Sequence, residues 1–378
     1  MSVSGDYGIV NQIEFQGRSF AGASVSNYGV VQTGDVVYTK SPLNSNPYGI
    51  IKTNKGKPGI VSTLYAVYHP KENAFSDFIQ VYFEQHARMN NYMHPLVNKG
   101  AKNDMKVSAE NALKGPVCFP SRIEQESISA FFSVLDNLIT LHQRKFEKLT
   151  NVKKSMLEKM FPQNGCSYPE IRFKGFTDAW EQRKLSEMCG TFEYGLNAAA
   201  KEFDGKNKYI RITDIDDASR EFLLSDLSSP DICLDGMSKY LLSSGDIVFA
   251  RTGASVGKTY IYRENDGIVY FAGFLIRAKV NQDNDAEFVF QSTLSPSYEK
   301  YIRITSQRSG QPGVNAQEYG EYDLFAPSKE EQQRIGHFLR GIDNLITLHQ
   351  RELEKLQNIK KSMLEKMFVY GGTRKWES

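Results

Sequence analysis

The feature that most constrains this chain is a nine-residue stretch that occurs twice. Asp136–Arg144 reads DNLITLHQR and returns letter for letter at Asp343–Arg351, 207 residues later (343 − 136). The same offset places Lys153–Phe161 on Lys360–Phe368 without a gap. A gap-free repeat of about forty residues at this period is too long for a solenoid unit. The repeat therefore predicts a duplicated module in which a globular region is followed by a long helix.

The repeated stretches lie in residues 120–161 and 327–368, where apolar residues recur in steps of three and four. This spacing predicts two long helices, each with a narrow apolar seam. Ser121, with Glu124 three residues later, matches a capping box at the start of the first helix. Because a seam left in water is unfavourable, we expect the helices to pair antiparallel as a coiled coil about a pseudo-twofold axis. The expected seam comprises Leu135, Leu138, His142, Leu149, Met156, Ile342, Leu345, His349, Leu356 and Met363.

His142 and His349 are expected close to each other near this axis. A metal site is one interpretation of the pair. We favour the other, in which each histidine is a polar seam position that fixes the register of the helices.

The globular regions have the pattern of mixed α and β structure. β-Branched and aromatic runs bounded by turn residues predict strands, at Gly34–Thr39, Ile60–Tyr68, Pro116–Phe119, Tyr209–Thr213, Gly245–Ala250, Thr259–Tyr262 and Phe271–Ile276. Helical spacing occurs at Phe75–Met89 and Glu287–Ile304, and each is followed by a polar loop, Asn98–Lys106 and Thr305–Asn315. These regions are only faintly similar to each other. The difference indicates either that the two regions bind different ligands of one class or that their surface loops drifted after duplication.

Composition excludes several classes of protein. The four cysteines, at positions 118, 166, 189 and 233, form no C-x-x-C pair, so neither a zinc ribbon nor a disulfide framework is indicated. We expect no metal site in this chain. There is no signal peptide and no apolar run long enough to cross a bilayer. The net charge of +2 permits a nucleic-acid partner without requiring one.

Two motifs resemble catalytic ones but depart from them. Gly253–Thr259 has three residues between its glycines where a phosphate loop needs four, and a strand pattern follows where a helix is needed. Asn46-Pro47-Tyr48 lacks one proline of the adenine-methyltransferase motif. No catalytic constellation is visible, so we predict a binding protein with no catalytic residues.

Basic and amide side chains gather in the loops, where they suit phosphates and base edges. The tight turn after Ala250 is a good way to present Arg251 and Lys258 to DNA. The candidate DNA-binding residues are Lys40, Lys52, Lys55, Lys57, Lys99, Lys102, Asn103, Lys206, Lys208, Arg211, Arg251, Thr252, Ser255, Lys258, Gln307, Arg308, Gln311 and Asn315.

The repeated helices carry a family resemblance. Glu124-Gln125 and Glu331-Gln332, the DNLITLHQR stretches and the two KKSMLEKMF stretches resemble the specificity subunit of Type I restriction–modification systems. Phe173–Leu185 resembles the opening of one of its target recognition domains. The resemblance covers essentially the whole chain and is most specific in the helices.

The resemblance implies an α/β (α+β) protein in which two recognition domains are separated by two antiparallel helices. The expected division is 1–119 (first recognition domain), 120–161 (first helix), 162–172 (linker), 173–326 (second recognition domain), 327–368 (second helix) and 369–378 (tail). Since 173 − 207 is negative, we expect the first recognition domain to be incomplete at its N-terminus, whereas Arg374–Glu377 faintly echoes Trp180-Glu181.

The same resemblance implies a cytoplasmic, non-catalytic subunit that reads a bipartite target in double-stranded DNA. Its partners would be two methyltransferase subunits, which use S-adenosylmethionine, and restriction subunits that translocate DNA with ATP and Mg. The chain itself would hold no cofactor and contact no membrane. Two rival hypotheses stay open: a coiled-coil scaffold that binds proteins, and a stand-alone DNA-modifying enzyme.

Overall fold

A computed structural model describes residues 1–5, 7–18, 24–40, 43, 46–97, 106–163, 165–307 and 310–368. The chain divides into two compact units. Unit 1 comprises Met1–His142 and Glu352–Ser378, and unit 2 comprises Gln143–Arg351. Each unit is described by itself below. Within the described residues, no helix is both long and apolar enough to cross a membrane.

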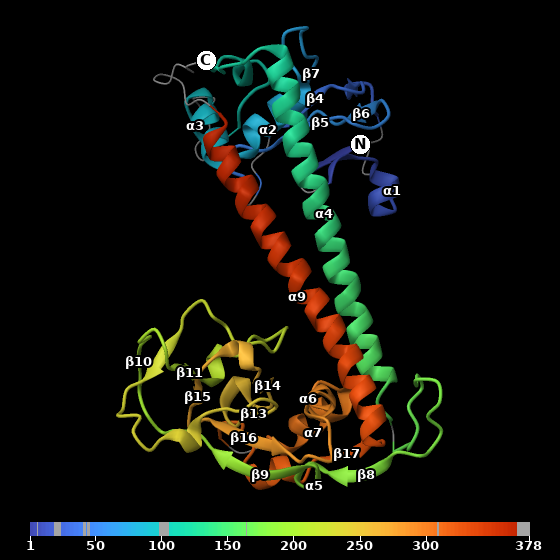
Figure 1. Cartoon of the computed structure of the whole chain (residues 1–378). Coiled ribbons are helices and arrows are strands. Elements are labelled where there is room, and N and C mark those ends of the chain that lie inside the picture. The colour runs from blue at the N-terminus through green and yellow to red at the C-terminus, as the bar shows by residue number, and fades with distance from the viewer. Residues whose placement is uncertain are drawn as a thin grey trace. The chain divides into compact units, whose positions relative to one another are not determined.

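Two helices of 38 residues dominate the secondary structure, α4 (Arg122–Lys159) and α9 (Lys329–Lys366). Both were predicted from the repeat, and both are shorter than predicted by two residues at each end. The Ser121 hydroxyl accepts the Glu124 N–H at 3.3 Å, as the capping pattern requires. Each helix contributes residues to both units, so each unit contains a segment of α4 and a segment of α9 (Figure 1).

The helix segments are tied together in the same way in both units. In unit 1 the Lys360 ammonium lies 2.6 Å from the Asp136 carboxylate, and in unit 2 Lys153 pairs with Asp343. Adding 207 to Asp136 and to Lys153 gives Asp343 and Lys360, so the two ion pairs are copies of one contact. The N-terminal part of α4 thus meets the C-terminal part of α9 in unit 1, and the reverse pairing holds in unit 2.

Two expected seam residues are on the wrong face of their helices. Leu138 is 38% exposed and Leu345 is 46% exposed. The buried row passes instead through Phe132 and Leu339, both 0% exposed, and a step of seven from there, two helical turns, reaches Ile139 and Ile346. Leu and Ile are adjacent at both positions, and the helix phase places Ile139 and Ile346 nearer the buried row than Leu138 and Leu345.

Other seam predictions fit the structure better. Leu135 and Ile342 are buried, and Leu356, Met363 and Met156 are partly buried against hydrophobic clusters. Leu149 is half-buried. His142 belongs to unit 1 and His349 to unit 2, so their expected proximity stays a prediction.

Unit 2 is built on an antiparallel sheet in the order β14-β13-β16-β9. Its elements are β8 (Glu181–Lys184), α5 (Leu185–Met188), β9 (Cys189–Tyr194), β10 (Ala200–Glu202), β11 (Lys208–Ile210), β12 (Ser228–Pro230), β13 (Ile247–Ala250), β14 (Thr259–Ile261), β15 (Val269–Phe271), β16 (Leu275–Val280), α6 (Ala286–Ser292), α7 (Pro296–Thr305), α8 (Ala316–Gly320) and β17 (Asp323–Ala326). Outside the main sheet, β17 pairs with β8, β10 with β12, and β11 runs parallel to β15.

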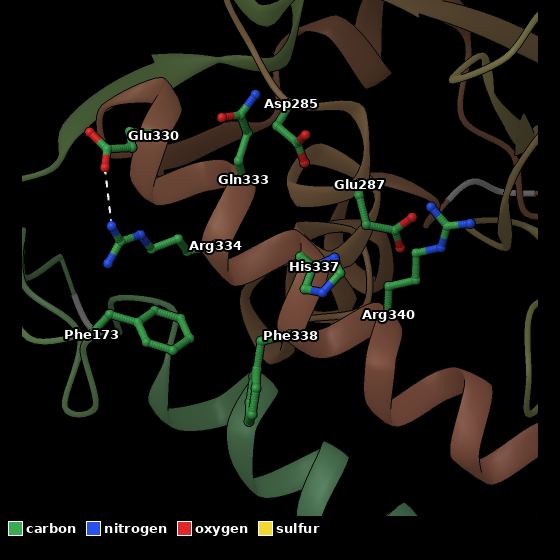
Figure 2. A pocket seen from close by; sticks show the side chains of 9 residues that line it. All are labelled: Phe173, Asp285, Glu287, Glu330, Gln333, Arg334, His337, Phe338 and Arg340. Atoms are coloured by element: carbon green, nitrogen blue, oxygen red, sulfur yellow. Dashed lines mark hydrogen bonds and ion pairs between the residues drawn. The ribbon is translucent and has the colours of Figure 1, made fainter.

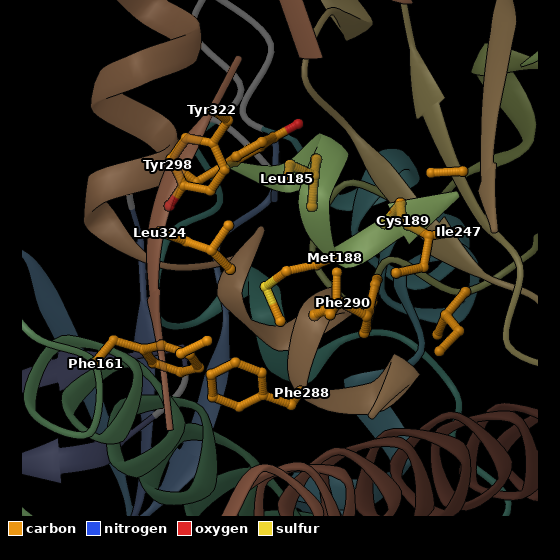
Figure 3. Close-up of a cluster of buried hydrophobic side chains, with 14 of the residues drawn as sticks. Phe161, Leu185, Met188, Cys189, Ile247, Phe288, Phe290, Tyr298, Tyr322 and Leu324 are labelled. Atoms are coloured by element: carbon orange, nitrogen blue, oxygen red, sulfur yellow. The ribbon is translucent and has the colours of Figure 1, made fainter. Parts of the chain in front are cut away.

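The main core of unit 2 gathers side chains from the sheet, from both long helices and from α6 and α7. Figure 3 shows Phe288 of α6 beside Phe161, which follows α4, with Met188 and Leu324 close by. The Phe161 and Phe288 rings stack at 5.4 Å, and Trp180 meets both rings edge-on. The end of α4 and the start of the globular chain are therefore held in one apolar cluster.

Unit 1 repeats part of this architecture. Its elements are β1 (Ser2–Ser4), β2 (Gly8–Val10), α1 (Gln12–Gln16), β3 (Gly29–Val31), β4 (Val36–Thr39), β5 (Ile51–Thr53), β6 (Gly59–Val61), β7 (Tyr65–Tyr68), α2 (Ser76–Glu84) and α3 (His86–Met93). The sheet order β5-β4-β7 matches β14-β13-β16 of unit 2. Asp35 and Asp246 also close equivalent turns before β4 and β13, since each carboxylate accepts the N–H three residues earlier.

Several predicted elements were too long. Ile60–Tyr68 is two strands, β6 and β7, and Phe271–Ile276 spans the end of β15 and the start of β16. Phe75–Met89 and Glu287–Ile304 each divide into two helices. In Glu287–Ile304 the division follows from Pro296, which starts α7 behind the N-cap Ser295. Pro116–Phe119 was predicted as a strand and is not one.

The clearest structural evidence for the duplication is a buried glutamine in each unit. Gln125 and Gln332 donate from Nε2 to the carbonyls of Pro120 and Pro327, both at 2.9 Å. Their Oε1 atoms accept the N–H groups at Phe75 (2.8 Å) and Asp285 (3.0 Å), where α2 and α6 begin. Each glutamine thus ties the start of a long helix to the start of a globular helix.

We expect Gln332→Ala to lower the stability of unit 2 by about 1–3 kcal/mol, because it leaves the half-buried Asp285 N–H and Pro327 carbonyl without these partners. Urea unfolding of the full chain, together with faster hydrogen exchange at the Asp285 amide, would show this loss. The neighbouring Gln333 is exposed, and Gln333→Ala is the matched control with an expected change within about 0.5 kcal/mol. Equal losses in the two variants would mean that the hydrogen bonds of Gln332 contribute nothing specific.

Candidate nucleic-acid interface

A tight connection between β13 and β14 presents the predicted residues Arg251, Thr252, Ser255 and Lys258. The chain leaves β13 at Ala250, makes a 3-10 turn at Gly253–Ser255 and re-enters the sheet at Thr259. Gly257 has a φ of 83°, and a Cβ there would lie 2.5 Å from the Ile302 side chain, so only glycine fits. A strand follows where a phosphate loop needs a helix N-terminus, which confirms that this turn is no phosphate loop.

The structure joins this turn to the second predicted loop. The Arg251 carbonyl accepts the Val314 N–H at 2.9 Å, and the Pro312 carbonyl accepts the Gly253 N–H at 3.0 Å. An isolated bridge pairs Thr252 with Gly313. Two loops that were separate candidates in the sequence, around Arg251 and around Gln311, therefore form one surface. Gln307 and Gln311 are exposed on it, and Arg308 lies outside the described residues.

Arg251 is the most suitable base-reading side chain of this surface. Its guanidinium carbon lies 5.0 Å from the centre of the Tyr194 ring. Stacking on an aromatic face orients a guanidinium but leaves its N–H donors available. Within the described part of the chain, no carboxylate pairs with Arg251. A guanidinium held in this way can donate two hydrogen bonds to the edge of a guanine.

Two exposed aromatic residues complete the surface, and sequence reasoning missed both. Tyr194 is 45% exposed, and its hydroxyl accepts the Ala316 N–H at 3.3 Å. Phe274 is 59% exposed, and its carbonyl accepts the Arg251 N–H at 3.0 Å. The sequence held a weak signal for Phe274, which lies inside the predicted strand Phe271–Ile276, and none for Tyr194, the last residue of β9. Their closeness to Arg251 depends on pairing between strands far apart in the chain.

Several candidates already have protein partners. Lys258 forms an ion pair with Asp217, and Arg211 makes a two-pronged contact with Asp214 at 2.8 and 2.9 Å. That hydrogen bonding raises the pKa of Arg211. Asn315 caps α8, because its side chain accepts the Glu318 N–H. The side chains of Lys258, Arg211 and Asn315 therefore already make contacts within the protein. A phosphate would have to compete with Asp217 for Lys258 and with Asp214 for Arg211.

The remaining candidates have other surroundings. Lys208 donates to the Asp266 carbonyl at 2.6 Å, and Lys206 is exposed in a turn next to Asp204. In unit 1, Lys55 lies 3.2 Å from Asp77, Lys57 is exposed, and Lys40 and Lys52 are half-buried at and after strand positions. Lys99, Lys102 and Asn103 lie outside the described residues.

An open cavity of about 810 Å³ occurs elsewhere in unit 2, along the first turns of α9. Figure 2 shows its lining: Phe173, Asp285, Glu287, Glu330, Gln333, Arg334, His337, Phe338 and Arg340. Glu330 pairs with Arg334, and Glu287 is already bound by Arg263. The lining contains no serine, cysteine or lysine for His337 to activate, so this cavity offers no nucleophilic centre.

The part of the chain that the structure describes offers no metal site either. Among the residues that the structure describes, no group of three or more His, Cys, Asp or Glu side chains could hold a metal ion. Burial raises the pKa of the Cys189 thiol to about 12, so this cysteine is a packing residue and not a nucleophile.

Comparisons with known proteins find a matching family and similar proteins. Residues 177–358 match the family described as the Type I restriction modification DNA specificity domain. The chain is 25% identical over 320 residues to the Type I restriction enzyme MjaVIII specificity subunit of Methanocaldococcus jannaschii, which covers 82% of this chain and 73% of that protein. It is 26% identical over 217 residues to the putative MjaX specificity subunit of the same organism, covering 54% of this chain and 50% of that protein.

The fold agrees as well. The structure is similar to the crystal structure of the S subunit of a Type I restriction–modification system from M. genitalium, with a TM-score of 0.61 and 14% identity over 91% of this chain and 85% of that one. The resemblance inferred from the repeated helices is thereby confirmed. Residues 177–358 match the Type I restriction modification DNA specificity domain, and the chain is similar over most of its length to specificity subunits of Type I restriction–modification systems.

Proposed function

We propose that this chain reads a bipartite DNA target and directs the methyltransferase and restriction subunits of a Type I complex to it. The observation that carries the proposal is the composite surface of unit 2, where Arg251 stacks on Tyr194 beside the exposed Gln311. Stacked arginines, exposed amides and aromatic rings are groups that read base edges and sugar–phosphate backbones.

The two-part target follows from the combination of near-identical helices and unlike globular regions. We propose that α4 and α9 form one antiparallel coiled coil with a pseudo-twofold axis, which spaces two recognition domains. The copied ion pairs Lys360–Asp136 and Lys153–Asp343 support this arrangement. Each recognition domain would then read one half of the target.

The chemistry would belong to partner subunits. In this proposal methyltransferase subunits bring S-adenosylmethionine, restriction subunits bring ATP and Mg, and the whole complex works in the cytoplasm. This chain contributes affinity and sequence preference alone. A scaffold protein that binds only proteins would lack the steep loss of DNA affinity with added salt that phosphate contacts produce.

The test is to sequence the methylated bases in cells that carry this chain with its methyltransferase partner. We expect a split motif with one methylated adenine in each half. For Arg251→Ala we expect about 1–3 kcal/mol weaker binding, or roughly 5- to 150-fold, with relaxed preference in one half only.

Arg211→Ala is the matched control, because Asp214 already holds that guanidinium. It should leave the motif intact. If Arg251→Ala weakens both halves equally, Arg251 contacts phosphate or supports the fold. An unsplit motif would rule out the two-domain reading of the target.

A further inference from the structure

The turn that leads into β16 carries an exposed aromatic residue directly opposite Arg251. β13 and β16 are antiparallel neighbours, and their register ends with Ala250 opposite Leu275. The Arg251 N–H donates to the Phe274 carbonyl at 3.0 Å, which extends this register by one pair. Residues that face each other in this way have Cβ atoms about 5 Å apart on one face of the sheet. Arg251 and Phe274 are therefore cross-strand neighbours.

The stacking of Arg251 on Tyr194 agrees with this placement. Ile276 lies opposite Tyr194 in β9 and opposite Phe249 in β13. Because side chains alternate between the two faces along a strand, Arg251 shares its face with Phe249, and Phe274 shares its face with Ile276. The three exposed groups of this surface, one guanidinium and two aromatic rings, therefore project from the same side of the sheet.

Unit 1 holds an equivalent pair at the same place. Its sheet order β5-β4-β7 matches β14-β13-β16, so β4 corresponds to β13 and β7 to β16. The Lys40 N–H donates to the Leu64 carbonyl at 3.1 Å, one residue beyond the last pair of the β4–β7 register. Lys40 and Leu64 therefore occupy the positions of Arg251 and Phe274.

The turns before β7 and β16 expose a large apolar side chain at the same position. In each turn the first residue of the strand donates its N–H to the carbonyl three residues earlier, at 3.1 Å from Tyr65 and at 2.8 Å from Leu275. Leu64 is 60% exposed and Phe274 is 59% exposed. One exposed apolar residue is ordinary on a protein surface. Two of them at one position of a duplicated turn, each beside a cation, indicate a shared use.

A cation beside an apolar side chain matches the major-groove edges of two neighbouring base pairs. Arginine and lysine donate to O6 and N7 of guanine, and apolar side chains contact the 5-methyl group of thymine. Successive base pairs are about 3.4 Å apart along the duplex axis, and the two side chains begin about 5 Å apart. One cross-strand pair can therefore reach two adjacent base pairs.

Given the DNA-reading function proposed above, we propose that each cross-strand pair reads one two-base step of the target. In unit 2, Arg251 binds a guanine and Phe274 packs on the 5-methyl group of a thymine in the adjacent base pair. In unit 1, Lys40 and Leu64 read the other half in the same way. Each half of the target then contains a G·C pair next to an A·T pair.

The test uses the full chain and a duplex with the target motif found by sequencing the methylated bases. Each thymine in turn is replaced by deoxyuridine, which lacks only the 5-methyl group. We expect one position in each half where this replacement weakens binding about 4-fold, the effect of one buried methyl group. In Phe274→Ala the replacement should have no effect in the half read by unit 2 and its full effect in the other half. Leu64→Ala should show the reverse.

Tyr168→Ala is the matched control, because this ring is 56% exposed but belongs to the linker. It should distinguish thymine from deoxyuridine as well as the unaltered chain does. Tolerance of deoxyuridine at every position by the unaltered chain would overturn the inference, although a split motif would still support the proposed function. An equal loss of affinity of Phe274→Ala for the thymine and deoxyuridine duplexes would also overturn it, because the ring would then not read the methyl group. Absence of a split motif would overturn both.

Discussion

Replacing Arg172 by alanine is expected to destabilise unit 2 by about 3–5 kcal/mol, the usual cost of leaving one partner of a buried ion pair alone. Glu331 is 1% exposed and lies in the first turn of α9, and both of its oxygens accept hydrogen bonds from Arg172. The same hydrogen bonding raises the pKa of Arg172. Without the guanidinium, the carboxylate must remain buried and unpaired or the helix start must open.

Urea unfolding followed by tryptophan fluorescence measures this effect. The chain has two tryptophans, so a Trp376→Phe background leaves Trp180 as the reporter within unit 2. Arg334→Ala is the control from the same helix turn, because its pair with Glu330 is exposed and such pairs contribute about 0–1 kcal/mol.

A second variant separates the buried charge from packing. Adding Glu331→Gln to Arg172→Ala removes the unpaired charge and should recover part of the loss. If the double variant is no more stable than Arg172→Ala, the destabilisation comes from lost packing of the arginine side chain.

Replacing Trp180 by alanine should cost about 3–5 kcal/mol, the range for large aromatic side chains removed from a core. Trp180 is 2% exposed and meets Phe161 and Phe288 edge-on at 6.3 and 5.8 Å. Its loss would leave a cavity where the end of α4, the linker and α6 come together. The effect should therefore reach the linker and the start of β8 and not stay local to one side chain.

Urea unfolding followed by circular dichroism gives the free energy, and hydrogen exchange should show faster opening of β8 and β17. Tyr168→Ala in the same linker is the control, since this ring is 56% exposed and its removal should cost little. Trp180→Phe should retain part of the stability. A Trp180→Ala chain as stable as the Tyr168→Ala chain would contradict the anchoring role of the tryptophan.

Local sequence patterns predicted single elements well where one physical signal dominated. The long helices followed from sustained steps of three and four, and β4, β13 and β14 from short apolar runs behind turns. The same signals failed where contacts with other segments of the chain determine the local structure. Leu138 and Leu345 were placed on the seam, although helix phase over two turns selects Ile139 and Ile346. Pro116–Phe119 has strand composition and remains irregular because it lacks a partner strand.

The candidate site shows the same division. The sequence identified Arg251 and Gln311 as suitable groups on two separate loops. Hydrogen bonds between Arg251, Gly253 and the 312–314 segment unite those loops, and strand pairing brings Tyr194 under the guanidinium. Neither contact leaves a periodic signal, since each joins residues about 60 positions apart along the chain.

The sequence by itself determined the duplication, the two long helices and the family resemblance, because a gap-free repeat is a property of the covalent chain and does not depend on folding. Tertiary structure decided which candidate side chains are available. Lys258 and Arg211 have the same charge as Arg251, but Asp217 and Asp214 bind them, whereas Arg251 rests on an aromatic ring. The reason is that a side chain's chemistry is written in the sequence, while its partners depend on which distant segments the fold brings within a few ångströms.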